Sequence, residues 1–294
     1  MNHPLSVVFC GTPDFAVPSL HALLADPAFA VKLVITQPDK PMGRHHTLTP
    51  SPVKVLAEQK GIPLWQPDDI NTQSSKLKAQ SSPFDFLVVV AYGQILSPAI
   101  LALPRIAPVN LHPSLLPRWR GASPIHHALL AGDAETGVTI QQMAEALDAG
   151  PILAQERLPL RPTETYASLR QTLAEKGASL LIRTLKNPLH PVPQETGSVT
   201  LCNKLTRRDG EADPGRMTAE EIDRRVRALN PWPGVTCPIQ GMTMKLLRTS
   251  LKEKPDTLPL SCAKGTTLFI TELQPPSGKP MSGAAWMRGH TRPR

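Results

Sequence analysis

The sequence predicts an α/β fold in which a doubly wound, mostly parallel sheet is followed by a smaller β-rich domain. Up to about residue 187, short apolar runs that end at turn residues alternate with segments of helical periodicity. Strands that alternate with helices in this way form open sheets with helices on both faces. After that point the alternation stops, and a polar, Pro-rich stretch leads into short runs that alternate apolar and polar residues, which indicates antiparallel strands.

The first elements carry recognisable start and stop signals. A buried strand ends at the turn residue Gly11, and Ser51 and Pro52 provide an N-cap followed by proline at the first helical position. In chain order we expect a strand over residues 5–11, a helix carrying Val17, Leu20 and Leu23, a strand over 31–37, a helix from Pro52 to Gly61, and a strand over 62–67.

A nearly continuous apolar run over residues 84–93 is typical of a central parallel strand that is covered on both faces. The wider stretch 86–104 is apolar enough to suggest a membrane span, but Gly93, Gln94 and Pro98 interrupt it. We therefore expect a buried strand followed by a loop. Further strands are expected over residues 108–114, 137–143 and 151–160, and a long helix over 163–187.

The change of pattern divides the chain into three predicted parts. These are a first domain over residues 1–189, a linker over 190–208, and a basic β-rich domain over 209–294. The third part opens with a short helix in which Thr218 and Glu221 form a capping box, and the sequence Asn-Pro-Trp-Pro-Gly ends this helix.

The formal net charge is +8, and most of the excess lies in residues 190–294, which hold 16 Lys and Arg against 10 Asp and Glu. A basic C-terminal third indicates an anionic partner such as nucleic acid, although a merely soluble basic surface is the simpler explanation of charge alone. Aromatic residues make up only 4% of the chain. Any nucleic acid would therefore be held mainly through its phosphates and not by stacking on aromatic side chains.

Several common kinds of site are absent from the sequence. The four cysteines form no CxxC pair and no zinc spacing, and the chain has neither a glycine-rich dinucleotide fingerprint nor a P-loop. We therefore expect no metal, and the sequence argues against a Rossmann oxidoreductase. The N-terminus runs into a strand without a charged n-region or a cleavage site, which predicts a cytoplasmic protein.

Polar side chains gather where predicted strands end. Asn110 and His112 lie two residues apart at the end of one strand and therefore point to the same face, at the edge where open α/β sheets bind ligands. Asp148 lies in a turn before another strand, where a carboxylate can orient an imidazole. This set suits direct acyl transfer to an amine, because the amide N–H can stabilise a tetrahedral oxyanion. Taken alone, the same residues also fit a turn amide, a structural histidine and an ordinary turn aspartate.

Longer segments carry a resemblance to a known family. The chain resembles the folate-dependent formyltransferases, and this resemblance is carried by residues 110–125 (NLHPSLLPRWRGASPI), 137–153 (GVTIQQMAEALDAGPIL) and 7–16 (VVFCGTPDFA). Within that family, a resemblance to the methionyl-tRNA formyltransferases extends over almost the whole chain and is carried by residues 36–57, 88–96, 204–213 and 227–234.

The resemblance implies a Rossmann-like catalytic domain, an OB- or barrel-like C-terminal domain, and a reaction. The formyl group of 10-formyltetrahydrofolate would move to the α-amino group of methionyl-initiator tRNA, for translation initiation, in a monomeric enzyme without a metal. By resemblance the catalytic residues are Asn110, His112 and Asp148; the folate-binding residues are Ser114, Leu115, Leu116, Pro117, Val90, Tyr92 and Gln94; and the tRNA-binding residues are Lys40, Arg44, Lys204, Arg207 and Arg208. Without the resemblance, these five basic residues are ordinary surface charge.

Other functions share parts of this pattern. A glycinamide ribonucleotide formyltransferase would need only the first domain, and a hydrolase of formyltetrahydrofolate would need no acceptor. A formyltransferase that acts on a small amine such as a UDP-amino sugar can carry a second domain, yet the basic segment 36–50 favours tRNA. A non-catalytic tRNA-binding module would not need the amide, imidazole and carboxylate.

Overall fold

The computed structural model describes residues 3–43, 47–73, 75, 77 and 83–290. The chain folds into two compact units that interleave along the sequence. The first unit comprises residues up to 121, 135–159 and 170–201, and the second comprises 122–134, 160–169 and the chain from 202 onward. Every predicted catalytic and folate-binding residue belongs to the first unit.

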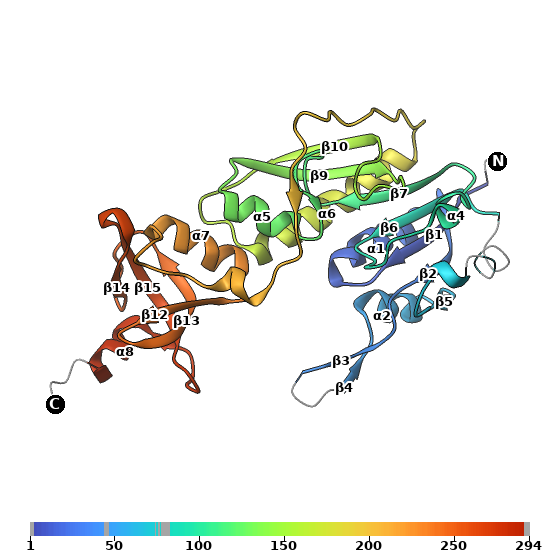
Figure 1. The fold of residues 1–294 in the computed structure, drawn as a ribbon. Coiled ribbons are helices and arrows are strands. Elements are labelled where there is room, and N and C mark those ends of the chain that lie inside the picture. The colour runs from blue at the N-terminus through green and yellow to red at the C-terminus, as the bar shows by residue number, and fades with distance from the viewer. Residues whose placement is uncertain (1–2, 44–46, 74, 76, 78–82, 291–294) are drawn as a thin grey trace. The chain divides into compact units, whose positions relative to one another are not determined.

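A seven-stranded sheet forms the centre of the first unit, with the strand order β10-β9-β7-β6-β1-β2-β5 (Figure 1). Its strands are β1 (Leu5–Gly11), β2 (Phe29–Ile35), β5 (Leu64–Trp65), β6 (Phe86–Val90), β7 (Ala107–His112), β9 (Glu135–Gln142) and β10 (Ile152–Pro159). The pairs from β5 to β7 are parallel, whereas β9 runs antiparallel to both β7 and β10. The mostly parallel sheet confirms the fold class predicted for this part of the chain.

The central strand β6 is buried along its whole length. Side chains of a strand alternate between its two faces, so five consecutive apolar residues place apolar side chains on both faces, as expected for a strand that is covered on both sides. Tyr92, Leu96 and Ile100, which follow β6, join the same core cluster as Val89. The expected loop after β6 also contains a one-turn helix, α4 (Pro98–Leu101).

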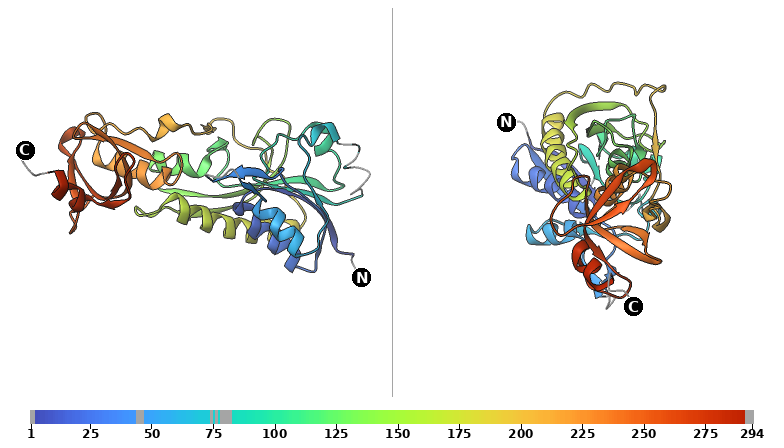
Figure 2. Two further views of the ribbon diagram at one scale, coloured as in Figure 1. Left: turned by 90° about the horizontal axis from the view of Figure 1, so that it is seen from below. Right: turned by 90° about the vertical axis from the view of Figure 1, so that its left-hand side faces the viewer.

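Helices and single 3-10 turns connect the strands of the first unit. They are η1 (Asp14–Ala16), α1 (Val17–Ala25), α2 (Pro52–Gln59), η2 (Asn71–Gln73) and α6 (Tyr166–Leu185). As predicted, Ser51 caps α2, and its hydroxyl accepts a hydrogen bond from the Lys54 N–H at 3.0 Å. From residue 170 onward, α6 lies on the same face of the sheet as α1 (Figure 2), where Arg170 pairs with Asp14.

Helix α6 packs closely on β7. A Cβ atom on Gly177 would lie 2.6 Å from Leu111 Cδ1, so this part of α6 lies directly against the Leu111 side chain, which a larger residue at position 177 would displace. Leu111 therefore points towards α6, and successive side chains of a strand point to opposite faces. It follows that Asn110 and His112 point to the face of the sheet away from α6.

Asp85 ties the start of β6 to the start of β1. Its carboxylate accepts hydrogen bonds from the Ser6 N–H at 2.8 Å and the Ser6 hydroxyl at 2.7 Å, and it pairs with Arg105 at 2.8 Å. Burial raises the pKa of Asp85, but the Ser6 donors and Arg105 outweigh it, so the pKa lies below its usual value.

Asp85→Asn should therefore destabilise the protein at neutral pH and matter less in acid. A lowered pKa means that the charged carboxylate stabilises the fold above the unfolded aspartate pKa of about 3.9, and that this is lost as the pH falls through the folded value. We expect a loss of about 1.5–3 kcal/mol at neutral pH, the range for hydrogen bonds to charged groups. Urea denaturation at a series of pH values from neutral to acid measures the difference in the free energy of unfolding between the wild type and Asp85→Asn. The exposed Asp68→Asn serves as control. A difference that stays constant into acid would contradict this account.

The basic segment between β2 and α2 contains a short hairpin. Strands β3 (Lys40–Met42) and β4 (Thr47–Thr49) pair antiparallel. At the base of the hairpin, Asp39 accepts hydrogen bonds from Lys54 Nζ at 2.7 Å and Gln66 Nε2 at 2.8 Å. The Lys54 and Gln66 hydrogen bonds lower the pKa of Asp39, and Lys54 anchors the hairpin to α2.

The second unit contains a five-stranded antiparallel sheet with the order β12-β13-β15-β14, in which β16 also pairs with β15. Its strands are β12 (Val235–Ile239), β13 (Met242–Ser250), β14 (Leu258–Ser261), β15 (Thr267–Gln274) and β16 (Met281–Ser282). Its helices and turns are α5 (Pro124–Ala131), η3 (Arg207–Gly210), α7 (Ala219–Leu229), η4 (Ala263–Gly265) and α8 (Gly283–His290). The antiparallel strands confirm the predicted smaller β-rich domain.

Helix α7 begins as the sequence predicts. Thr218 caps it, and Thr218 and Glu221 form the expected capping box.

Two further short strands, β8 (Arg120–Gly121) and β11 (Leu201–Cys202), pair with each other. Across the described part of the chain, every helix is too short or too polar to cross a membrane.

Candidate active site

Asn110 and His112 lie at the end of β7, in the part of this strand that pairs with β9. In the antiparallel pair, Asn110 is opposite Gln141 and His112 is opposite Thr139. Residues directly opposite each other point to the same side of a sheet, so these four side chains share one face. Strand β6 lies on the other side of β7, with Val89 opposite Asn110. The end of β7 therefore brings together groups from three strands.

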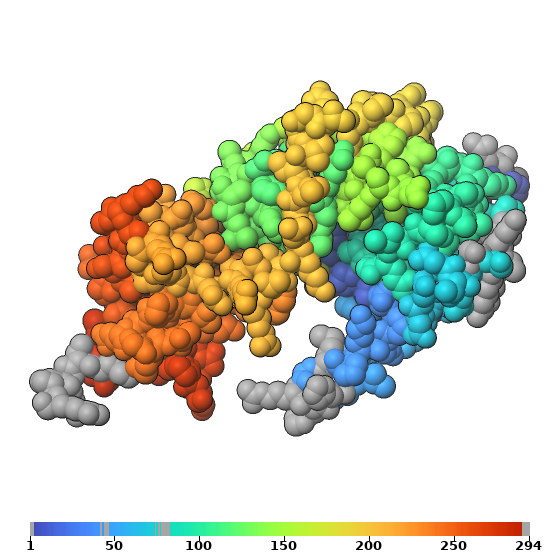
Figure 3. Space-filling view, in the orientation of Figure 1, coloured from blue at the N-terminus to red at the C-terminus, as the bar shows by residue number. Residues whose placement is uncertain are grey.

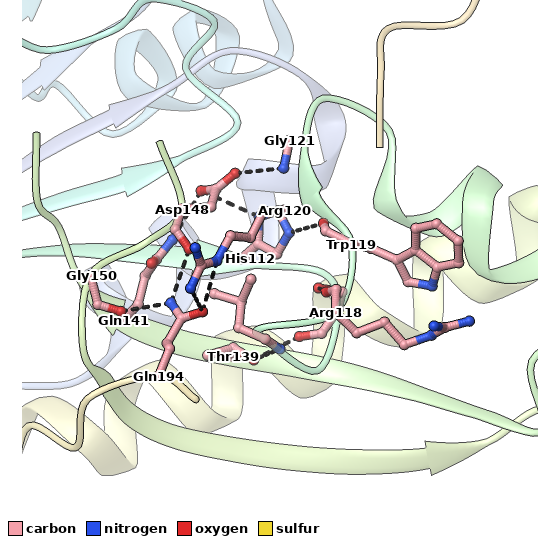
Figure 4. Close-up of polar contacts among 12 residues, drawn as sticks. His112, Arg118, Trp119, Arg120, Gly121, Thr139, Gln141, Asp148, Gly150 and Gln194 are labelled. Atoms are coloured by element: carbon pink, nitrogen blue, oxygen red, sulfur yellow. Dashed lines mark hydrogen bonds and ion pairs between the residues drawn. The ribbon is translucent and has the colours of Figure 1, made fainter. Parts of the chain in front are cut away.

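His112 is buried and has an acceptor oxygen near each ring nitrogen (Figure 4). Nε2 lies 2.9 Å from the Trp119 carbonyl oxygen, and Nδ1 lies 3.6 Å from Asp148 Oδ1. A carbonyl oxygen only accepts hydrogen bonds, so Nε2 carries a proton and donates a hydrogen bond to the Trp119 carbonyl. A ring protonated on both nitrogens would find an acceptor on each side, so this pocket can hold an imidazolium.

Asp148 is held in a tight turn. Its backbone has a φ of 51°, in the left-handed region that aspartate tolerates better than most residues. Its Oδ2 accepts a hydrogen bond from the Gly121 N–H and its Oδ1 accepts one from Gln141 Nε2, both at 2.9 Å. A Cβ atom on Gly150 would lie 1.9 Å from a backbone oxygen of β9, so the turn also depends on glycine there.

Gln194 secures the same turn from another part of the chain. Its Nε2 donates to the backbone oxygens of Asp148 at 2.9 Å and Gly150 at 2.7 Å. Its Oε1 accepts from the guanidinium of Arg120, from Nε at 3.0 Å and from Nη2 at 2.8 Å. Figure 3 shows residues 190–200 as an extended strip on the molecular surface. Sequence reasoning missed Gln141 and Gln194, because single glutamines carry no spacing or motif signal.

Hydrogen bonds attach the predicted folate loop after β7 to β9 and β10. The Ser114 hydroxyl donates to the Arg118 carbonyl at 2.6 Å, and the Leu116 N–H donates to the Thr139 hydroxyl at 3.1 Å. Gln155 Nε2 donates to the Leu116 carbonyl at 2.8 Å. Ser114 and Leu116 are buried, while Leu115 and Pro117 are partly exposed. The loop thus has a defined shape beside His112.

The other predicted folate residues lie at the end of β6 and just after it. Val90 and Tyr92 are buried, and burial raises the pKa of the Tyr92 phenol, which therefore stays protonated. Its hydroxyl makes no hydrogen bond to any other described residue. Gln94 is partly exposed and its amide is occupied, since Oε1 accepts from the Ile70 N–H and Nε2 donates to the Asp68 carbonyl, both at 2.9 Å.

The predicted tRNA residues are divided between the units. Lys40 is exposed on β3 in the first unit. Arg44 lies outside the described residues. Lys204, Arg207 and Arg208 are exposed in the second unit, the two arginines in η3.

The structure shows no group of three or more His, Cys, Asp or Glu that could hold a metal, within the residues it describes. All four cysteines are buried. Burial raises the pKa of Cys237 to about 12, so this thiol is not a ready nucleophile.

Comparison with known proteins identifies the family. Residues 5–185 match the family described as Formyl transferase, and residues 204–291 match the Formyl transferase C-terminal domain. A methionyl-tRNA formyltransferase of Dechloromonas aromatica is 39% identical over 97% of this chain and 96% of its own. One of Halorhodospira halophila is 42% identical over 96% of each chain.

Solved structures share the fold at much lower identity. HypX from Aquifex aeolicus, solved with tetrahydrofolic acid, superimposes with a TM-score of 0.65 at 16% identity, over 97% of this chain and 47% of that chain. An N-formyltransferase from Helicobacter canadensis has a TM-score of 0.67 at 16% identity, over 90% of this chain and 98% of its own. The family matches and the full-length relatives together show that the chain is an enzyme that belongs to the formyltransferase family and, within it, to the methionyl-tRNA formyltransferases.

Proposed function

We propose that this enzyme transfers the formyl group of 10-formyltetrahydrofolate to the α-amino group of methionyl-initiator tRNA. One observation carries the proposal: Asn110, His112 and Asp148 converge at one sheet edge in a chain whose similarity to methionyl-tRNA formyltransferases extends from end to end. This function also implies that the enzyme acts in the cytoplasm, and we expect it to act as a monomer.

The proposed reaction balances without a net acid or base. The amine nitrogen forms a bond to the formyl carbon, and the bond from that carbon to N10 of the folate breaks. One proton leaves the amine and one reaches N10. An aminoacyl amine titrates somewhat below a free α-amino group at ~8, so much of it is already neutral near pH 7 and can attack.

Each catalytic residue has a role that its position supports. The Asn110 side-chain N–H would donate to the formyl oxygen as it becomes an oxyanion. His112 would take the amine proton or pass one to the departing nitrogen. Asp148 would stabilise the imidazolium, as its Oδ1 at 3.6 Å from Nδ1 supports.

The residues near the site suit a folate. Val90, Leu116 and Pro117 are apolar and flank the edge at which β6 and β7 end, which suits a flat heterocyclic ring. The buried Tyr92 hydroxyl, which makes no hydrogen bond to another described residue, offers a polar group in the same region. A folate bound there would place its formyl group towards Asn110 and His112.

The exposed arginines of η3 should contribute to tRNA binding through phosphates. Arg207→Ala combined with Arg208→Ala should weaken tRNA binding with little change in kcat, because neither residue lies in the first unit. The slope of log binding constant against log salt should fall by about two, one per lost phosphate contact. Filter binding from low to high salt measures the slope, with the exposed Arg216→Ala as control. An unchanged slope would remove these arginines from the interface.

The proposed function is tested by offering the purified protein three acceptors with 10-formyltetrahydrofolate. These are methionyl-initiator tRNA, glycinamide ribonucleotide and a UDP-amino sugar. We expect formyl-methionine on the tRNA and no comparable transfer to the other two. Formylation of the amino sugar with none of the tRNA would replace the proposal with the small-amine alternative.

A further inference from the structure

Gln141 lies in the active site and only half of its amide is used. The side chain is 2% exposed and lies on β9 directly opposite Asn110. Its Nε2 donates to Asp148 Oδ1 at 2.9 Å (Figure 4). A carboxylate has no proton to give, so the nitrogen must face Asp148, and this fixes which end of the amide is the oxygen.

The other end of that amide lacks a partner. Gln141 Oε1 is buried and accepts no hydrogen bond from any described residue. Buried acceptors are normally satisfied, and an orphan at a reaction centre is a place where a ligand can supply the donor. The nearest catalytic neighbour across the strand pair is Asn110, with Cβ atoms about 5 Å apart in such pairs.

The chemistry of the substrates limits what that donor can be. N10 of 10-formyltetrahydrofolate is bonded to three carbons and carries no hydrogen, and the formyl oxygen only accepts. Of the groups that meet at the reacting carbon, the attacking amine alone brings N–H donors. An N–H directed at Gln141 would leave the nitrogen lone pair free to face the formyl carbon.

We propose that Gln141 contacts the substrate: its Oε1 accepts a hydrogen bond from the attacking amine while its Nε2 holds Asp148. The first bond strengthens during the reaction, because the amine nitrogen becomes positively charged as it adds to the carbonyl. Such a contact stabilises the transition state more than the ground state, so it acts on kcat. The proposal rests on the proposed function, since it needs an amine acceptor.

Gln141→Met, which removes both donor and acceptor at similar volume, tests the proposal. It should lower kcat for methionyl-tRNA about 10- to 100-fold, the range for a hydrogen bond to a charged group. The dissociation constant for tetrahydrofolate should stay within about twofold, since no folate contact is removed. Gln142→Met is the matched control, because Gln142 is the next residue along β9 and points to the other face; it should leave kcat unchanged.

A second variant separates the two halves of the amide. Gln141→Lys keeps a donor for Asp148 but has no acceptor, so it should be as slow as Gln141→Met. Recovery of wild-type kcat by Gln141→Lys would show that only Asp148 needs Gln141, and would overturn the amine contact. If Gln141→Met fails to bind tetrahydrofolate, Gln141→Asn, which keeps an amide but withdraws it, should show the same loss of kcat.

The two proposals can fail separately. A wild-type enzyme that formylates none of the methionyl-tRNA would refute the proposed function. A wild-type enzyme that does so, with Gln141→Met equally fast at saturating substrates, would refute only the role of Gln141.

Discussion

His112→Gln should lower kcat for formyl transfer by about 10²–10⁴-fold, the contribution of a positioned general acid or base. Glutamine can keep a donor towards the Trp119 carbonyl, which His112 Nε2 contacts at 2.9 Å. It cannot accept a proton, so the substitution removes the chemistry while leaving much of the packing. Steady-state kinetics at saturating methionyl-tRNA measures the loss.

Two controls make the His112 result interpretable. Tetrahydrofolate binding should be nearly unchanged, because the predicted folate residues lie on the loop after β7 and at or just after the end of β6, and the substitution alters none of them. His21→Gln, at an exposed position of α1, should keep full activity. Wild-type kcat in His112→Gln would show that His112 carries no proton in this reaction.

Asn110→Ala should lower kcat by about 10²–10³-fold, which corresponds to roughly 2.7–4 kcal/mol for the loss of one oxyanion donor. The side chain is only partly buried at the end of β7, so its removal should cost little stability. Rapid-quench measurement of a single turnover isolates the chemical step from product release.

The effect of Asn110→Ala should appear in kcat and not in substrate affinity. The oxyanion exists only after attack, so the lost donor acts on the transition state alone. Asn187→Ala removes an exposed amide that donates to the Arg183 carbonyl and serves as control. A rise in KM at constant kcat would assign Asn110 to substrate binding instead.

Most elements of the fold could be predicted because their signals are local. The capping residues Ser51 and Thr218 mark helix starts through their own hydrogen bonds, and the apolar run in β6 reflects burial on both faces. The direction of β9 could not be predicted. A strand has the same apolar pattern whether it pairs parallel or antiparallel, and direction depends on distant partners.

The interleaving of the two units has a similar cause. α5 belongs to the second unit and lies against α7, with Gly132 close to the Arg224 side chain. Nothing in residues 124–131 identifies a partner almost 100 positions later in the chain. Local periodicity shows that a helix has an apolar face, but it does not show what covers that face.

The active site, too, could be predicted only in part from the sequence. Asn110 and His112 share a face because they are two residues apart in a strand, and this much follows from the sequence. The structure adds the approach of Asp148 Oδ1 to His112 Nδ1 at 3.6 Å. The supports from Gln141, Gln194 and the Gly121 N–H arise from contacts that span 7 to 46 positions.

The central claim is that Asn110 and His112 act together in a single step, the transfer of the formyl group, and a double-mutant cycle tests it directly. The single-turnover rate of formyl transfer is measured for the wild type, Asn110→Ala, His112→Gln and the double variant, with substrates saturating. Residues that act as a unit are strongly non-additive, so the double variant should be little slower than the slower single variant. Losses that multiply would mean that the two side chains act independently, which would contradict the account.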